Sequence, residues 1–269
     1  MRRANRPVSV SKTASIQQAF YTSISRSQPI DGFLDDYAFL IRGLIDYYIA
    51  TLDLDVLRFA KELQDIQNAL FWDDENGGYF YSQANAKNVV VRLKEDHDGA
   101  EPCGNSVSAK NLCLLSAYFE DKSYKEKAIK LFDFFAGSSP FGYVLPEMFS
   151  ALLLHDYNLT MLVIVGEFSS AAPSRNESLA KRFVHISGPN NDATKALADV
   201  ARDFYIPGLL LVHCNTDEPI ETLTRKSAAG FKMAKNESTV YLCHNRVCQL
   251  PITTPEGLRE SLSERYLLH

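Results

Sequence analysis

Residues 31–51 read DGFLDDYAFLIRGLIDYYIAT, and this stretch decides the fold class. Its apolar residues recur on nearly every face of a helix, so the helix must be buried among other helices. Residues 54–71, LDVLRFAKELQDIQNALF, instead place apolar residues at helical spacing with charges between them. The two segments predict one inner helix paired with one outer, amphipathic helix.

The same pattern continues to about residue 157. Gly77-Gly78 predicts a turn between aromatic, strand-like flanks in WDDENGGYFYS. The segment NVVVRL, residues 88–93, is a short strand candidate. Three more helices are expected at 105–120, 123–136 and 146–157.

The pattern changes at LTMLVIVGE, a compact apolar run that indicates a buried strand. A helix at 191–205 and a second strand at 206–214 follow, which predicts a strand–helix–strand crossover. A hairpin across 238–252 and a final helix begun by Thr254 and Pro255 complete the chain. We therefore expect a mainly α protein with a division near residue 158. The expected parts are a flexible leader at 1–30, helical hairpins at 31–157 and a small α/β region at 158–269, with an inserted loop at 167–190.

The charge is distributed unevenly along the 269 residues, whose formal net charge is −5. Residues 1–30 hold five basic residues and no acid. Removing these five from the total of 28 leaves 23 basic against 33 acidic residues in 31–269, a net charge of −10. An acidic body disfavours nucleic acid as a partner.

Five scattered cysteines do not form a dense disulfide framework, which favours an intracellular, reduced protein. Cytoplasmic location is expected first, and the acid-free, Arg- and Ser-containing N-terminus leaves a mitochondrial presequence as the alternative. No apolar run approaches the ~20 residues that a membrane span needs.

Several long segments carry a family resemblance. They are GFLDDYAFLIRGLIDYY, LQDIQNALFWDDENGGYFYS, RLKEDHDGAEPCGNSVSAKNL, VLPEM, LVIVGE, YIPG and YLCHNRVCQLPITTPEGLRESL. From about residue 31 to the end, with a break at 167–190, the chain resembles the spermatogenesis-associated protein 20 family. The resemblance implies a partial (α/α) six-hairpin toroid, like that of glycosidases and N-acylglucosamine 2-epimerases, followed by a small α/β region. It also implies a thioredoxin-like domain that this sequence lacks, so the chain resembles the C-terminal portion only.

Acidic side chains supply the candidate catalytic residues. In helical toroids, sugar sites lie where loops precede inner helices, and sugar chemistry needs one protonated and one ionised carboxyl group. Asp36 and Glu101 are the candidate pair, and their carboxyl carbons are expected within roughly 10 Å. Asp35, Asp98 and Asn105 are expected nearby. Helix capping is the alternative role for Asp35 and Asp36, because the helix dipole favours acids in the first turn.

Other polar and aromatic residues have less specific interpretations. Glu95, Asp96 and His97 are expected to face solvent, and Asp73 and Asp74 to lie in a solvated turn. Gly104, Asn105 and Ser106 are expected to start the following helix with a capping side chain. Glu147 is interpreted as a helix-capping acid. The aromatic residues either form a sugar platform or pack the hairpin onto the helices: Trp72, Tyr79, Phe80 and Tyr81.

The CHNRVC segment places Cys243, His244 and Cys248 close together. A zinc site needs further ligands, for which His213 and Cys214 are the available residues, but the spacing matches no established signature. No metal and no cofactor are therefore expected, and a disulfide across the hairpin is the other interpretation.

Three hypotheses about function follow. The favoured ones are a non-catalytic helical module, linked to redox chemistry through the absent thioredoxin-like domain, and an inactive fragment. The alternative is a glycosidase- or epimerase-like enzyme with a sugar ligand, using the paired carboxylates. Fold analogy alone does not decide among them.

Overall fold

The computed structural model describes residues 32–84, 86, 89–137, 144–156, 160–165, 191–206, 209–214, 231, 233–244 and 247–266. Its helices are α1 (Leu34–Thr51), α2 (Leu54–Phe71), α3 (Gly104–Phe119), α4 (Lys122–Ala136), α6 (Pro146–Asp156), α7 (Asn191–Arg202) and α8 (Pro255–Tyr266). Its strands are β1 (Thr160–Val165), β2 (Leu209–Cys214), β3 (Thr239–His244) and β4 (Val247–Cys248). The expected leader at 1–30, the insertion at 167–190 and Asp31 lie outside the described residues.

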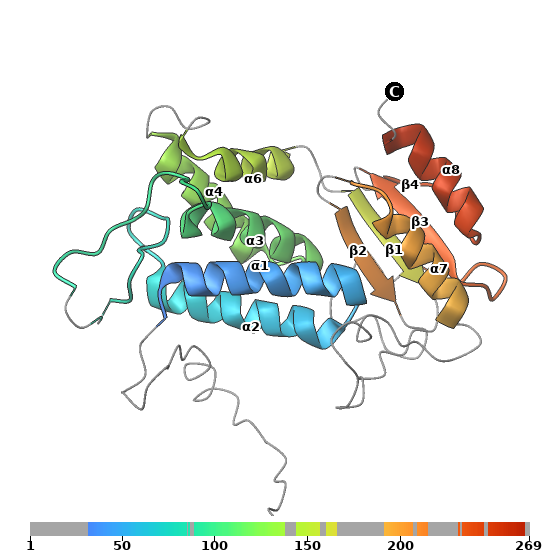
Figure 1. Ribbon diagram of the computed structural model, residues 1–269, viewed down its shortest axis with the longest axis horizontal. Coiled ribbons are helices and arrows are strands. Elements are labelled where there is room, and N and C mark those ends of the chain that lie inside the picture. Colours follow the sequence, from blue (N-terminus) through green and yellow to red (C-terminus); the bar gives the residue numbers. More distant parts are fainter. Residues whose placement is uncertain are drawn as a thin grey trace, which may run out of the picture.

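The helices form layers around α3 (Figure 1). Twelve of the 16 residues of α3 are buried, because α1, α4 and α6 all pack against it. Helix α1 buries Tyr37, Ile41, Ile45 and Tyr48, and α2 covers it from outside. The sequence therefore predicted the α1–α2 pair correctly, but the most enclosed helix is α3.

Four strands form one sheet with the order β2-β1-β3-β4. Strands β1 and β2 are parallel and α7 lies between them in sequence, as predicted for the crossover. Helices α7 and α8 lie on the side of the sheet away from α1–α6 (Figure 1). Arg202 connects the two parts, since its Nε donates to the Ile49 carbonyl oxygen at 3.1 Å. At the start of α8, Thr254 Oγ1 accepts from the Gly257 backbone, which confirms the predicted cap.

The short strand predicted at 88–93 is wrong for the residues described there. Val90 is 98% exposed and Val91 is 67% exposed. Leu93 accepts one backbone hydrogen bond, from Tyr81 N at 2.7 Å. Valines favour strands where they pack on a half-buried sheet, and these two valines have no such surface beneath them.

The turn at Gly77-Gly78 is confirmed. Both glycines have positive φ, 79° and 78°, which other residues rarely adopt. A Cβ on Gly77 would also lie 2.9 Å from the Lys130 carbonyl oxygen, so the turn packs closely against α4. Its flanks are joined by a single antiparallel bridge between Trp72 and Tyr79.

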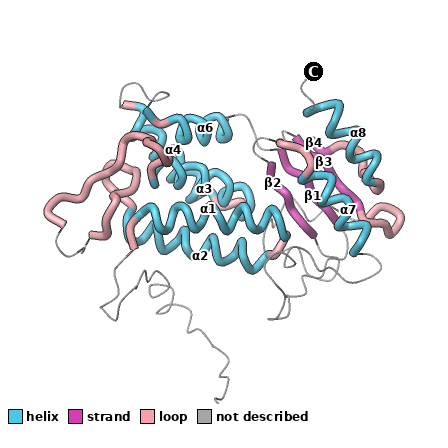
Figure 2. The backbone as a smooth tube through the Cα atoms, in the orientation of Figure 1, coloured by secondary structure: helices cyan, strands magenta, loops and turns pink. Residues whose placement is uncertain are grey.

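The mainly α class with a small α/β region is confirmed. The partial six-hairpin toroid and the division near residue 158 stay predictions. The loops between α2 and α3 gather at the end of the helices remote from the sheet (Figure 2). This end also contains the first turns of α1 and α3, and the candidate acids are therefore brought to one region.

Candidate functional site

Four acids from two segments define the carboxylate cluster: Asp35, Asp36, Glu95 and Glu101. Asp35 and Asp36 occupy the first turn of α1. Glu95 and Glu101 belong to the loop that precedes α3. The negative charges of Glu95, Asp36 and Glu101 all act on Asp35, which shows that the two segments converge electrostatically.

Asp35 is the most perturbed member of the cluster. Burial raises the pKa of its carboxyl group, and the charge of Glu95 raises it further. The Gly104 backbone N–H partly offsets this effect, while Asp36 and Glu101 add to it, and the resulting pKa is about 6. Among the described residues, Oδ1 of Asp35 is buried and has no hydrogen bond of ordinary geometry. Asp35 is thus positioned to hold a proton close to neutral pH.

Gly104 makes this arrangement possible. A Cβ at this position would lie 2.3 Å from Asp35 Oδ1 and 2.8 Å from Leu34 Cγ. Only a residue without a side chain lets the first turn of α1 approach the first turn of α3 this closely. The sequence pattern predicted Gly104 only as part of the helix start and gave no sign of its close contact with Asp35.

An aromatic pair borders the cluster. The rings of Phe33 and Tyr81 stack with centroids 5.1 Å apart. The Leu34 backbone N–H donates to the Tyr81 carbonyl oxygen at 3.0 Å, which joins this loop to α1. Burial raises the pKa of the Tyr81 hydroxyl, and the charges of Asp35, Glu95 and Asp36 raise it further. Of the four aromatic residues proposed as a platform, Tyr81 is therefore the one beside the acids.

Asp36 and Glu101, the predicted catalytic pair, are both exposed. Asp36 Oδ2 accepts from the Phe33 backbone N–H at 2.8 Å, so it has the capping role considered as the alternative. The pairing of Asp36 with Glu101 itself stays a prediction. Glu95 was expected to face solvent, but it is partly buried, and its charge has the largest effect of any acid on Asp35.

Asp98 has a structural role at the junction of two helices. Its Oδ1 accepts from Cys103 N and its Oδ2 from Glu147 N, both at 2.9 Å. It therefore satisfies backbone donors at the starts of α3 and α6. Glu147 instead extends its carboxylate to Lys110 Nζ at 2.8 Å. Asp96 and His97 are exposed, as expected.

Asn105 is buried, and its side chain hydrogen-bonds to the backbone of two loop residues. Its Oδ1 accepts from Tyr79 N at 2.8 Å, and its Nδ2 donates to Tyr79 O at 3.0 Å and Glu95 O at 3.4 Å. The expected capping by Asn105 or Ser106 is wrong, since the N-cap residue is Cys103 and its side chain makes no capping bond. Asn105 supports the cluster by fixing the backbone at Glu95.

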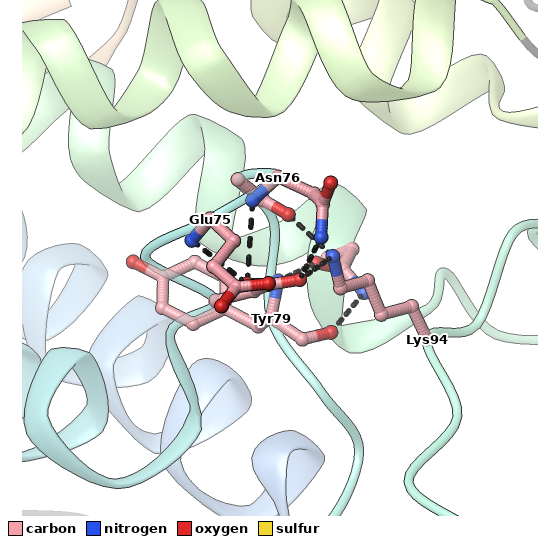
Figure 3. A network of polar contacts seen from close by, with 7 residues as sticks. Glu75, Asn76, Tyr79 and Lys94 are labelled. Carbon is pink, nitrogen blue, oxygen red and sulfur yellow. Dashed lines mark hydrogen bonds and ion pairs between the residues drawn. The ribbon is translucent and has the colours of Figure 1, made fainter.

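The prediction of a solvated turn is wrong for Asp73. Its side chain is 10% exposed and lies 2.8 Å from Lys94 Nζ, whose side chain is 9% exposed. Glu75 N, Asn76 N and Asn76 Nδ2 also donate to it, and Figure 3 shows Glu75, Asn76 and Lys94 converging on this network. Burial alone would raise the pKa of Asp73, but Lys94 and the Asn76 donors outweigh it and hold that pKa far below the usual range.

The other aromatic residues pack the loop onto the helices. Tyr79 is fully buried, and its hydroxyl donates to Asn68 Oδ1 at 2.6 Å. Trp72 packs edge-on against Tyr79, and Lys94 Nζ lies 4.9 Å from the Phe80 ring centroid. These contacts agree with the packing interpretation for Trp72, Tyr79 and Phe80.

Cys243 and Cys248 form a disulfide between β3 and β4. No group of three or more potential metal ligands occurs in the part of the chain that the structure describes. His213 is buried, and the side chains of Cys214 and His244 lie outside the described set. Among the described residues, no helix is long and apolar enough to cross a bilayer.

Comparison with known proteins identifies the relatives of this mainly α protein. No family model matches the chain. It is 36% identical over 240 residues to spermatogenesis-associated protein 20 of Rattus norvegicus and 36% identical over 238 residues to that of Homo sapiens. An uncharacterized protein of Caenorhabditis elegans is 32% identical over 240 residues.

These matches cover 87–88% of this chain. The chain therefore belongs to the spermatogenesis-associated protein 20 family, as the sequence resemblance indicated. It spans only 28% of the length of the rat and human relatives and 29% of the worm protein.

Proposed function

We propose that the carboxylate cluster binds a polyhydroxylated ligand of the carbohydrate class, with Asp35 as the proton donor. The observation that carries this proposal is the half-buried Asp35 carboxyl group, surrounded by three further acids and seated against Gly104. Carbohydrate chemistry requires a protonated acid beside a second carboxylate. The Phe33–Tyr81 pair adds an apolar surface of the kind that covers a sugar ring.

The roles of the acids follow from their surroundings. Asp35, with a pKa of about 6, retains its proton in a fraction of molecules at neutral pH. Glu101 and Asp36 are exposed, so a ligand can reach them from solvent. Glu95 acts on Asp35 through its charge. This assignment keeps Glu101 and Asp36 as ligand-facing acids and gives the acid role to Asp35.

A panel of mono- and disaccharides tests this proposal by saturation-transfer NMR on the 269-residue chain. We expect binding by wild type and at least a tenfold loss in Asp35→Asn and Glu101→Gln. Asp46→Asn is the matched control, because Asp46 is an exposed α1 acid paired with Arg42. Binding that survives Asp35→Asn, or no binding of any sugar by wild type, would reject the assignment.

We also propose a module role for this region within proteins of the relatives' length. In such proteins redox chemistry of the C-x-x-C type is assigned to the thioredoxin-like domain, because the 269 residues contain no C-x-x-C pair. Deleting the corresponding region from the human relative should leave dithiol activity in an insulin-reduction assay. Loss of that activity with an intact thioredoxin-like fold would contradict the division of roles.

A further inference from the structure

The hairpin formed by β3 and β4 contains a pair of cysteines that the carboxylate cluster does not involve. Cys243 and Cys248 occupy directly opposed positions in the antiparallel register, with Cα atoms 3.9 Å apart. Their environments differ strongly, because Cys243 is 2% exposed whereas Cys248 is exposed. β4 is an edge strand of the sheet, and Cys248 on it is accessible to solvent.

We propose that Cys243–Cys248 is a thiol–disulfide exchange site for an external dithiol, with Cys248 as the sulfur attacked first. Attack on a disulfide requires access to one sulfur atom, and the exposed Cys248 provides it. The buried Cys243 is shielded from direct attack and serves as the leaving group. This inference is independent of the proposed carbohydrate site.

A thiolate of the external dithiol attacks Sγ of Cys248, the Cys243–Cys248 bond breaks, and Cys243 leaves with the electron pair and takes up a proton. The second thiolate of the dithiol then attacks the dithiol sulfur that is now bonded to Cys248. This attack breaks the mixed disulfide and releases Cys248 as a thiolate, which is protonated. Two electrons and two protons pass to the protein, and the external dithiol becomes a disulfide.

The surrounding sheet allows the pair to open without loss of the fold. Gln249 N donates to Leu242 O at 2.9 Å, next to the disulfide. Val240 and Ile252 exchange two backbone hydrogen bonds, at 2.7 and 2.9 Å. In α8, which follows this segment in the sequence, Leu258 and Leu262 are fully buried. These contacts hold the segment after β4 against β3, so both thiols stay near each other after reduction.

The two other described cysteines do not compete. Cys103 and Cys113 are buried free thiols. Burial raises the pKa of Cys103 to about 11 and that of Cys113 to about 12, which suppresses their thiolate forms. Cys103 and Cys113 are therefore poor competitors of the hairpin for exchange with an external thiol.

The first test reduces the wild-type chain with dithiothreitol under native conditions. We expect complete and reversible reduction of Cys243–Cys248, with an unchanged far-UV circular dichroism spectrum and continued amide protection at Val240 and Ile252. Reduction that requires denaturant, or that removes this protection, would show a purely structural disulfide and overturn the proposal.

The second test assigns the order of attack. In a Cys214→Ser background, oxidised glutathione should modify Cys243→Ser at Cys248 at least ten times faster than it modifies Cys248→Ser at Cys243. Wild type treated with reduced glutathione and quenched in acid should carry its adduct on Cys248 by peptide mapping, which requires no folded variant. Adducts on Cys243, or equal rates in the two variants, would refute the assignment.

Discussion

Asp73 and Asp35 lie in the same loop-rich end of the helices and are both withdrawn from water, yet their surroundings are opposite. Asp73 meets a lysine, an asparagine side chain and two backbone donors. Asp35 meets three other acids, and none of the ion pairs among the described residues involves it. Folding therefore lowers the pKa of Asp73 and raises the pKa of Asp35.

The difference separates two uses of a buried acid. A carboxylate surrounded by donors locks a turn, and its charge is neutralised locally. A carboxyl group placed among like charges costs stability in its ionised form, and this is the arrangement found where an acid must hold a proton. Asn105 joins both regions through Tyr79 and Glu95, so each can be perturbed while the other is observed.

Lys94→Met should give the largest effect. It leaves Asp73 as a buried charge without its cation, so we expect a loss of about 3 kcal/mol in the free energy of unfolding at pH 7. Methionine retains an apolar side chain against Phe134, over whose ring Lys94 Nζ lies at 3.8 Å. Urea denaturation measures the change.

Two controls sharpen this prediction. Adding Asp73→Asn to Lys94→Met should recover much of the loss, because the orphaned charge is removed. Arg58→Ala breaks an exposed pair with Asp55 and should cost less than about 0.5 kcal/mol.

Because the pKa of Asp73 is lower in the folded state, the stabilisation from its charge is present above about pH 4 and is lost as the pH falls further. A Lys94→Met penalty that does not shrink between pH 7 and pH 2 would contradict a charge-based cause.

Gly104→Ala should destabilise by about 2 kcal/mol, because the new methyl group collides with Asp35 and Leu34. Leu34 is 1% exposed and belongs to the hydrophobic core. Gly43→Ala is the matched control in α1, since a Cβ there meets no heavy atom within 4 Å. It should stabilise by up to about 1 kcal/mol. Equal effects of the two substitutions in urea denaturation would show that α1 and α3 do not approach closely at Gly104.

Asp35→Asn should stabilise the protein at neutral pH. The folded state raises the pKa of Asp35 from 3.8 to about 6, so this group favours folding at low pH and that contribution is lost as the pH rises through 6. The full shift corresponds to roughly 3 kcal/mol, and partial exposure reduces the expected gain to about 1 kcal/mol. The gain should be present at pH 7.5 and absent near pH 4 in thermal or urea denaturation. A less stable variant at pH 7.5 would mean that the carboxylate has a stabilising partner.

Local pattern was enough to predict most of the fold. Helix α2 begins and ends where its apolar spacing begins and ends, and Thr254 caps α8 as its sequence indicated. The strand predicted at 88–93 was wrong because valine-rich sequence does not by itself supply a sheet to pack on.

The acids could not be assigned in the same way, because their pKa values depend on distant neighbours. Asp73 meets a lysine 21 positions later in the sequence, and Asp35 is desolvated by α3, which begins 69 positions later. Sequence patterns placed the acids at helix starts, but contacts across loops decide which acid is neutralised. Lys94, a cation immediately before an acidic run, was the one sequence signal for the Asp73 network.

The smallest predicted effects rank the charges around Asp35. Glu95→Gln should lower the pKa of Asp35 most, Asp36→Asn less, and Glu101→Gln least, in the order in which their charges act on it. Each change should be a few tenths of a pKa unit, since two of the three acids are exposed and screened by solvent. A carboxyl-carbon NMR titration of Asp35 measures them, and 1 M salt should shrink all three. Asp46→Asn, near the other end of α1, should leave the Asp35 titration unchanged. A Glu101→Gln variant that also leaves it unchanged at low salt would remove Glu101 from the cluster and leave Asp35, Asp36 and Glu95 as its members.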